Sequence, residues 1–285
     1  LNLYSDGDLI VPGKDITGAE NLRFEVKDHY QVATSRKTFE ALYRFFRERD
    51  PKKERTMYEA GEPILIGGKT VSLGTNNPQK NAEIQVYELD SNTGFRMDDR
   101  PLKKIVSDEN GNWGPFKGKA GVHYEFLLIP EGNHQRKIHY YRTPFYSDNP
   151  FVYLRALPPS GSMAGMLLAG LPKDDNQSIA AIFTANQAVI HGRDQLIIDD
   201  IELSTSAFAP ASANHIAWFL YDANFNKATD AEAIPAFQMA PFLTGVDVFF
   251  PTQNPQTITA TFNGEKLNFR NWKSGSDGIV VLVFD

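Results

Sequence analysis

The first fifty residues alternate apolar stretches with polar turns and then change to helical spacing. Residues 1–4 fit the end of a buried strand, and residues 21–26 alternate as a second strand would. Ser35 is a favourable helix cap, and the large apolar residues that follow it recur at helical spacing, which predicts a helix of about four turns. Strand, loop, strand, loop and helix is typical of the last part of an alternating α/β sheet. The apolar positions of the predicted helix are Phe39, Leu42, Tyr43 and Phe46.

After about residue 55 the pattern changes to short β-rich runs separated by Gly, Asn, Asp and Pro. Over residues 55–146 this spacing predicts a small antiparallel sandwich. The turn from Asp108 to Trp113 is similar to one found in transthyretin-like, carboxypeptidase-regulatory-like modules. Residues 147–285 predict a second sandwich or a jelly-roll-like domain. Strand candidates are residues 64–66, 70–73, 83–89, 124–129, 151–157, 179–183, 195–203, 216–221, 246–250, 257–262 and 279–284.

Composition narrows the class of protein. With 285 residues, 41% of them hydrophobic and 22% charged, the chain has the profile of an ordinary globular protein of two or three domains. No apolar run approaches the roughly 18 residues of a membrane-spanning helix. The net charge of -6, without a basic stripe, argues against nucleic-acid binding. The absence of Cys excludes disulfides and thiolate chemistry but does not fix the compartment.

Two polar residues follow the first two predicted strands. Asp8 comes after the first strand and His29 after the second, so a parallel pairing would bring both to the carboxyl ends of neighbouring strands. In acyl transfer an imidazole takes the proton of the nucleophile, and a carboxylate fixes the tautomer of that imidazole. We therefore predict that Asp8 and His29 are catalytic, with Asp6 as the less favoured acid. The alternatives are a turn-forming aspartate and a surface histidine.

The same residues carry a resemblance to a family. Asp-Leu-Ile-Val at residues 8–11, Gly-Ala-Glu-Asn at residues 18–21 and His29 resemble the C-terminal part of the small bacterial lipases of the α/β-hydrolase fold. A hydrolase part followed by long β-rich additions is also similar to the Archaeoglobus-type lipase, which has a C-terminal β domain. The resemblance implies a Ser-His-Asp triad. It further implies that residues 55–285 are a lipase C-terminal region involved in substrate access or acyl-chain accommodation.

Two features depart from the family pattern. Asp28 precedes His29, where family members often place Gly. The chain also lacks the Gly-x-Ser-x-Gly nucleophile elbow. The nearest approach, at residues 160–165, has the wrong spacing and follows the His, so Ser162 is not expected to be the nucleophile. We expect the nucleophilic Ser on an upstream hydrolase segment of about 150 or more residues, or on a companion chain.

The predicted fold class is mixed and mostly β. Residues 1–54 are expected to be the C-terminal part of an α/β-hydrolase sheet. Residues 55–146 are expected to form one antiparallel β-sandwich, and residues 147–285 a sandwich or jelly-roll-like lipase C-terminal domain. The predicted function is a carboxylic-ester hydrolase, a lipase on acylglycerol-type esters. The alternative is a non-catalytic β-sandwich binding module with a hydrolase remnant.

No cofactor and no metal are expected. The expected partners are a lipid or other ester substrate, the segment that carries the Ser, and a lipid interface at the protein surface. His123, His134 and His139 suggest a metal site only weakly, and solvated loop histidines are the simpler interpretation. The acidic pairs at residues 98–99 and 174–175, and a third at 199–200, lack the spacing of a calcium loop and are interpreted as polar turns.

Overall fold

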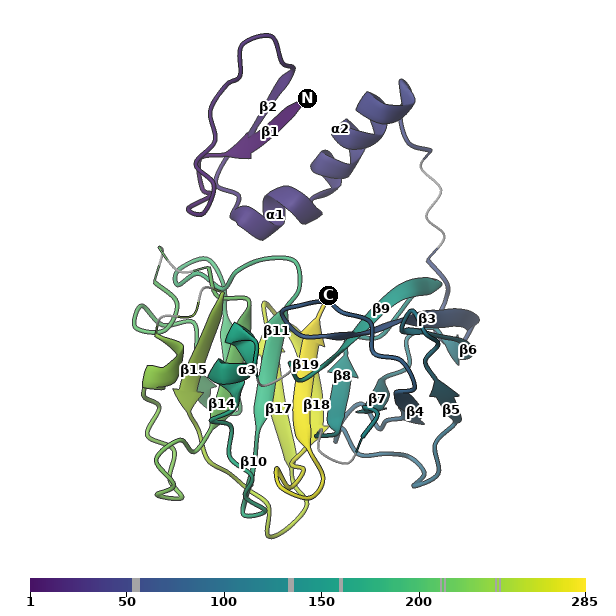
Figure 1. Ribbon diagram of the computed structural model, residues 1–285, viewed down its shortest axis with the longest axis vertical. Coiled ribbons are helices and arrows are strands. Elements are labelled where there is room, and N and C mark those ends of the chain that lie inside the picture. The colour runs from purple at the N-terminus through teal and green to yellow at the C-terminus, as the bar shows by residue number, and fades with distance from the viewer. Residues whose placement is uncertain are drawn as a thin grey trace.

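A computed structural model describes residues 1–52, 57–132, 136–158, 161–210, 212, 214–238, 240 and 242–285. The strands and helices of residues 1–52 stand beside a larger β-rich body (Figure 1). None of the described helices is long and apolar enough to cross a membrane.

The helices are α1 (His29–Thr34), α2 (Arg36–Arg47), α3 (Met163–Leu168) and the 3-10 helix η1 (Pro235–Phe237). The strands are β1 (Asn2–Ser5), β2 (Asn21–Phe24), β3 (Pro63–Ser72), β4 (Glu83–Glu88), β5 (Lys103–Val106), β6 (Asn112–Lys119), β7 (Tyr124–Ile129), β8 (Ile138–Arg142), β9 (Asn149–Ala156), β10 (Gln177–Ser178), β11 (Ala180–Thr184), β12 (Leu196–Ile198), β13 (Ile201–Glu202), β14 (Ala217–Tyr221), β15 (Leu243–Asp247), β16 (Phe250–Pro251), β17 (Thr257–Phe262), β18 (Glu265–Arg270) and β19 (Ile279–Phe284).

The first part of the chain forms the elements that its pattern predicts. β1 and β2 pair in parallel, with Leu3 opposite Leu22. The helix α2 begins after Ser35, whose hydroxyl accepts a hydrogen bond from the Thr38 amide at 3.2 Å. These elements are a two-stranded sheet and two helices, which is less than an α/β-hydrolase sheet. That part of the predicted fold class therefore remains a proposal.

The body is built on one eight-stranded sheet with the order β15-β14-β11-β19-β8-β7-β4-β5. A mostly β fold with several sheets, consistent with a β-sandwich, is confirmed, but the pairing is not antiparallel throughout, as two antiparallel sandwiches would require. The strand pairs β8–β19, β19–β11 and β14–β15 are parallel. Each joins strands that are distant in sequence, and only a long crossover connection allows parallel pairing.

Side chains on both faces of this sheet are buried, so it lies between two apolar cores. Along β19, Val281 and Val283 belong to one core, whereas Val280 and Leu282 belong to the other. A three-stranded sheet, β6-β3-β9, contributes to the first core, and a four-stranded sheet, β13-β12-β17-β18, contributes to the second. Helix α3 adds Leu168 to the first core. Burial on both faces explains why β19 reads as a continuous apolar run.

The strands do not separate cleanly at the predicted boundary after residue 146. Strand β9 lies beyond it, yet it pairs with β3. The eight-stranded sheet also takes β8 from one side of the boundary and β19 from the other. The predicted turn between Asp108 and Trp113 is present: the Asp108 carboxylate accepts the amides of Asn110 and Asn112, and Trp113 is buried in the first core.

A buried polar network ties β7 and β8 to the segment after β18. Glu125 is fully buried and accepts two hydrogen bonds from Arg96, both at 2.7 Å, and a third contact joins it to His139 at 2.6 Å. The His139 ring stacks on Trp272 at a centroid distance of 4.2 Å. Burial alone would raise the pKa of the Glu125 carboxyl, but Arg96 and His139 outweigh it and lower that pKa.

Replacing Glu125→Gln should destabilise the protein by about 3–5 kcal/mol, because it leaves the Arg96 charge buried without its partner. Since the pKa of Glu125 is lowered by folding, its contribution to stability is present above the unfolded-state pKa and is lost as the pH falls through the folded-state value. Urea unfolding monitored by tryptophan fluorescence measures the difference. The control is Glu83→Gln, which removes a partly exposed carboxylate near Lys104 and should change stability by less than about 1 kcal/mol. Equal effects of the two substitutions would contradict the importance of the network.

Candidate functional site

Asp8 is held at the end of β1 by the chain that follows it. One carboxylate oxygen, Oδ1, accepts hydrogen bonds from the backbone amides of Ile10 and Val11, both at 2.9 Å. The residue is 8% exposed. A turn of this kind is what a short acidic side chain favours at a strand end. It fixes the carboxylate and leaves Oδ2 for another partner.

That partner is His29. The His29 Nδ1 atom lies 2.9 Å from Asp8 Oδ2. The carboxylate is largely buried, whereas the imidazole side chain is 37% exposed. Because Asp8 occupies Nδ1, the other ring nitrogen, Nε2, is the one that can meet a substrate or a nucleophile. The structure thus brings together the two residues that the sequence predicts as catalytic, in the geometry of the acid and base of a triad.

The environment of Asp8 keeps its carboxyl group ionised. Burial would raise the pKa of Asp8, but the hydrogen bonds from Val11, His29 and Ile10 outweigh it and lower that pKa. An ionised Asp8 can stabilise an imidazolium at His29. Asp6, the less favoured acid, forms an ion pair with Arg23 instead.

Asp28, the departure from the lipase pattern, has two structural roles. Its Oδ1 atom caps α1 by accepting the amides of Tyr30 and Gln31, at 3.0 and 2.9 Å. Its Oδ2 atom accepts the Ala188 amide and an Arg193 N–H, both at 3.2 Å, from the β body. The residue is 2% exposed. Asp28 therefore joins the segment that carries His29 to the body.

Other contacts support the same junction. The Gln31 side-chain Nε2 donates to Gln187 Oε1 at 3.0 Å, and the Thr34 hydroxyl lies 3.0 Å from the Asn186 carbonyl oxygen. The Tyr30 ring packs against Phe242 with its centroid 5.6 Å away. The sequence signal for α1 is the Asp28-x-x-Gln31 capping box, which sequence analysis missed because it assigned Asp28 to a loop. Nothing in the sequence around Arg193 marks it as a partner of Asp28.

A cavity of about 550 Å³ begins beside Tyr30, the residue after His29. Its wall is mostly apolar, and Arg142, Arg155 and Asp285 add polar groups. Burial and then the Asp28 charge raise the pKa of the Tyr30 phenol, which therefore stays protonated. The apolar side chains of the wall include Leu73, Phe151, Phe183, Ile216, Phe242 and Val283.

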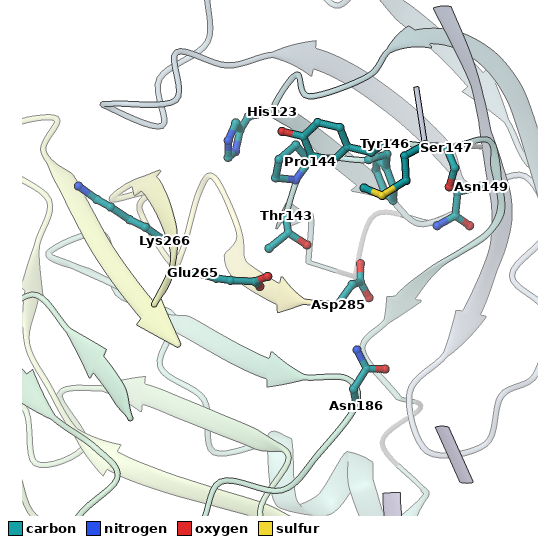
Figure 2. Close-up of a pocket in the computed structure, with 12 residues that line it drawn as sticks. His123, Thr143, Pro144, Tyr146, Ser147, Asn149, Asn186, Glu265, Lys266 and Asp285 are labelled. Atoms are coloured by element: carbon teal, nitrogen blue, oxygen red, sulfur yellow. The ribbon is translucent and has the colours of Figure 1, made fainter. Parts of the chain in front are cut away.

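A second cavity, of about 720 Å³, is more polar. Glu265, Asn186 and Asp285 approach it from different elements, and His123 and Tyr146 lie on the opposite side (Figure 2). Asp285 lines both cavities. Small-molecule sites are usually lined mostly by apolar side chains, so this polar cavity matches their size but not their usual lining.

His139 and Ser162 have structural roles. His139 is not a solvated loop histidine, as sequence analysis expected, because it is buried in β8 and paired with Glu125. His134 and Ser160 lie outside the described residues. Ser162 accepts the Gly165 amide at 2.9 Å as the cap of α3. Among described residues, no group of three or more His, Cys, Asp or Glu side chains is arranged to hold a metal ion.

Comparisons with known proteins relate part of the body to lipases. Residues 62–159 match the family model of the lipase C-terminal domain. A second model, for a C-terminal domain whose description gives no activity, matches residues 183–285. No curated protein matches the chain. The chain therefore contains a lipase-like C-terminal domain.

The solved structures that are similar to this chain include three whose names do not describe a lipase. (S)-allantoin synthase is 12% identical over 36% of this chain and 43% of its own, with a TM-score of 0.25. Hydroxyquinol 1,2-dioxygenase from Pseudomonas putida DLL-E4 is 11% identical over 43% of this chain and 72% of its own, with a TM-score of 0.23. The Bacillus anthracis TIE protein is 12% identical over 78% of this chain and 33% of its own, with a TM-score of 0.24. The chain spans less than half the length of (S)-allantoin synthase, and scores this low carry no argument about function.

Arg193→Ala should loosen the segment around His29 from the β body, because it leaves the buried Asp28 carboxylate without its cationic partner. Hydrogen exchange of the α1 amides should speed up by about tenfold or more. Arg100→Ala is the control, since Arg100 is almost fully exposed and forms an ion pair with nearby Asp98. If α1 exchanges at the same rate in both variants, Arg193 does not hold the junction.

Proposed function

We propose that this protein is a serine carboxylic-ester hydrolase of the lipase type, with acylglycerol-like esters as substrates. The observation that carries the proposal is the hydrogen bond between Asp8 and the His29 imidazole, with Asp8 fixed by two amides and His29 open to solvent. The lipase C-terminal domain match in the same chain supports it. Asp8 and His29 are the proposed catalytic residues.

We assign the following roles to the two residues. His29 Nε2 takes the proton of a serine hydroxyl during attack on the ester carbonyl, and then returns it to the leaving alcohol. Asp8 holds the proton on Nδ1 and stabilises the imidazolium between these steps. The serine and the backbone amides that bind the oxyanion belong, in this proposal, to a further hydrolase segment or a companion chain.

Uncovered apolar side chains support a further segment. Phe39, Leu42 and Phe46 lie on one face of α2, and each is exposed. Leu9 and Val11, beside the proposed acid, are also more than half exposed. A parallel sheet of two strands covers neither face of itself, and exposed apolar groups in this density mark a contact surface. We infer that a hydrolase segment with the nucleophilic Ser packs here.

The cavity beside Tyr30 suits an acyl chain. Its wall is mostly apolar and includes Tyr30, whose ring centroid lies 5.7 Å from that of the proposed general base, His29. A lipid interface is part of the same proposal, because a water-insoluble ester must reach this cavity from an aggregate.

Fluorophosphonate labelling of the intact protein, with any chain that purifies with it, tests the proposal. We expect labelling of a serine outside the present sequence, together with hydrolysis of p-nitrophenyl esters. His29→Ala should lower kcat by several orders of magnitude, and Asp8→Asn by about 10⁴-fold, because the imidazole loses its tautomer. Intact mass of the preparation identifies the labelled polypeptide.

His123→Ala is the matched control, since this histidine belongs to the β body and lines the other cavity. It should leave kcat within about twofold. A folded protein that is never labelled and hydrolyses no ester would contradict the proposal. It would favour the alternative, a binding module that uses the polar cavity of about 720 Å³.

A further inference from the structure

The loop after β14 has the spacing of oxygen-bearing side chains that is typical of a calcium site. Residues 222–230 read Asp-Ala-Asn-Phe-Asn-Lys-Ala-Thr-Asp, which places Asp or Asn at the first, third, fifth and ninth positions. A calcium loop takes side-chain oxygens at these positions and a backbone carbonyl at the seventh. The match is independent of the acidic pairs considered earlier, all of which lie elsewhere.

The backbone of the loop follows the same pattern. The Asp222 carboxylate accepts the amides of Asn226 and Lys227, at 3.2 and 2.8 Å, so the loop folds around its first residue. Phe225 and Lys227, at the fourth and sixth positions, have φ of 61° and 63°. The usual pattern places Gly at the sixth position because the chain turns sharply there, and Lys227 adopts that turn without Gly.

A buried carboxylate on β15, the strand that pairs with β14, adds a further oxygen ligand to those of the loop. Asp247, at the end of β15, is 5% exposed, and its Oδ2 atom accepts the Ala223 amide at 2.9 Å. Its backbone pairs with Glu232 and Ala231, so the residue lies between the start and the end of the loop. The Asp247 Oδ1 atom is buried and has no hydrogen-bond partner among the residues that the structure describes. An orphaned carboxylate oxygen of this kind is costly unless a cation meets it.

The negative charges around Asp247 also favour a bound cation. The loop carboxylates of Asp222 and Asp230 lie near enough to repel the buried Asp247 carboxylate. The Asp230 amide faces the same carboxylate and partly offsets this repulsion. Asp222 is itself 1% exposed. Two buried carboxylates beside a third are a site for positive charge.

We propose that residues 222–230, together with Asp247, bind Ca²⁺. The oxygen donors are the carboxylates of Asp222, Asp230 and Asp247, the amide oxygens of Asn224 and Asn226, and a backbone carbonyl. In the ion-free loop, Asp230 Oδ2 accepts the Nδ2 groups of both asparagines, at 2.7 and 2.8 Å. As they stand, these three carboxylates are not among the described groups arranged to hold a metal ion, so binding has to draw them together. Binding exchanges these two donors for the cation.

The loop lacks the Glu that a typical calcium loop has at its twelfth position, which is Ala233 here. Asp247 supplies the missing carboxylate from another strand. With Asn at two positions the ligand charge is modest, so we expect a dissociation constant of about 10⁻⁵ to 10⁻³ M. Mg²⁺ should bind more weakly, because it demands a near-ideal octahedral site and gives up its water reluctantly.

Terbium luminescence on the metal-stripped chain tests the proposal, because Tyr221 precedes the loop and can sensitise a bound lanthanide. Terbium emission excited through tyrosine should saturate, and Ca²⁺ should displace it at lower concentration than Mg²⁺. Ca²⁺ at ten times its dissociation constant should lower the unfolding equilibrium constant about elevenfold, seen as a rise in Tm. Neither readout involves ester hydrolysis, so the outcome is independent of the proposed function.

Asp247→Asn is the decisive variant, since it removes a buried charge at nearly constant volume and should leave the ion-free fold intact. It should weaken Ca²⁺ binding at least tenfold, and Asp222→Asn should do the same. Asp174→Asn, which alters a similar turn in the same body, should leave the affinity unchanged. No terbium emission and no shift of Tm with Ca²⁺ would overturn the proposal, as would wild-type affinity in both variants.

Discussion

The proposed acid–base pair depends on how the Asp8 carboxylate is fixed. Asp8 leaves β1 in a turn where two consecutive amides bind the same oxygen, and this orients the other oxygen toward His29. The parallel register of β1 and β2 sets the distance between the two loops, because it aligns the strand ends from which they start. Without that register the two side chains would have no reason to meet. Local turn chemistry and strand pairing therefore combine to make the proposed acid and base.

Buried charges occur where separate parts of the chain join. Asp28 links the His29 segment to the body through Arg193. Glu125 links β7 to Arg96 and to His139 on β8. In both places the charge has a partner that offsets the cost of its burial. Asp247 differs, since one of its oxygens has no hydrogen-bond partner in the described part of the chain, and this difference is what leads to the proposed calcium site.

The proposed acid and base, Asp8 and His29, were largely predictable because the sequence patterns that mark them are local. Asp8 and His29 each follow a predicted strand within a few residues, and this position can be read from the sequence. The cap of α2 at Ser35 can be read in the same way, because apolar residues at helical spacing follow it. The role of Asp28 was only partly visible: its capping box is local, but its bond to Arg193 joins residues far apart in sequence.

Pairing across long separations explains the other errors. The parallel contacts of β19 with β8 and β11 depend on crossovers that no local pattern encodes. His139 looked like a loop histidine because its partner, Glu125, lies on another strand. The loop at residues 222–230 was overlooked because Asn replaces Asp and Lys replaces Gly in the expected pattern.

The tautomer of His29 tests the central claim most directly. Nitrogen-15 NMR of the imidazole in the full protein, near neutral pH, reports which ring nitrogen carries the proton. The account predicts a proton on Nδ1, shared with Asp8 and strongly downfield, that disappears in Asp8→Asn while the rest of the spectrum is retained. A neutral ring protonated on Nε2, or an Nδ1 signal unchanged by Asp8→Asn, would contradict the account.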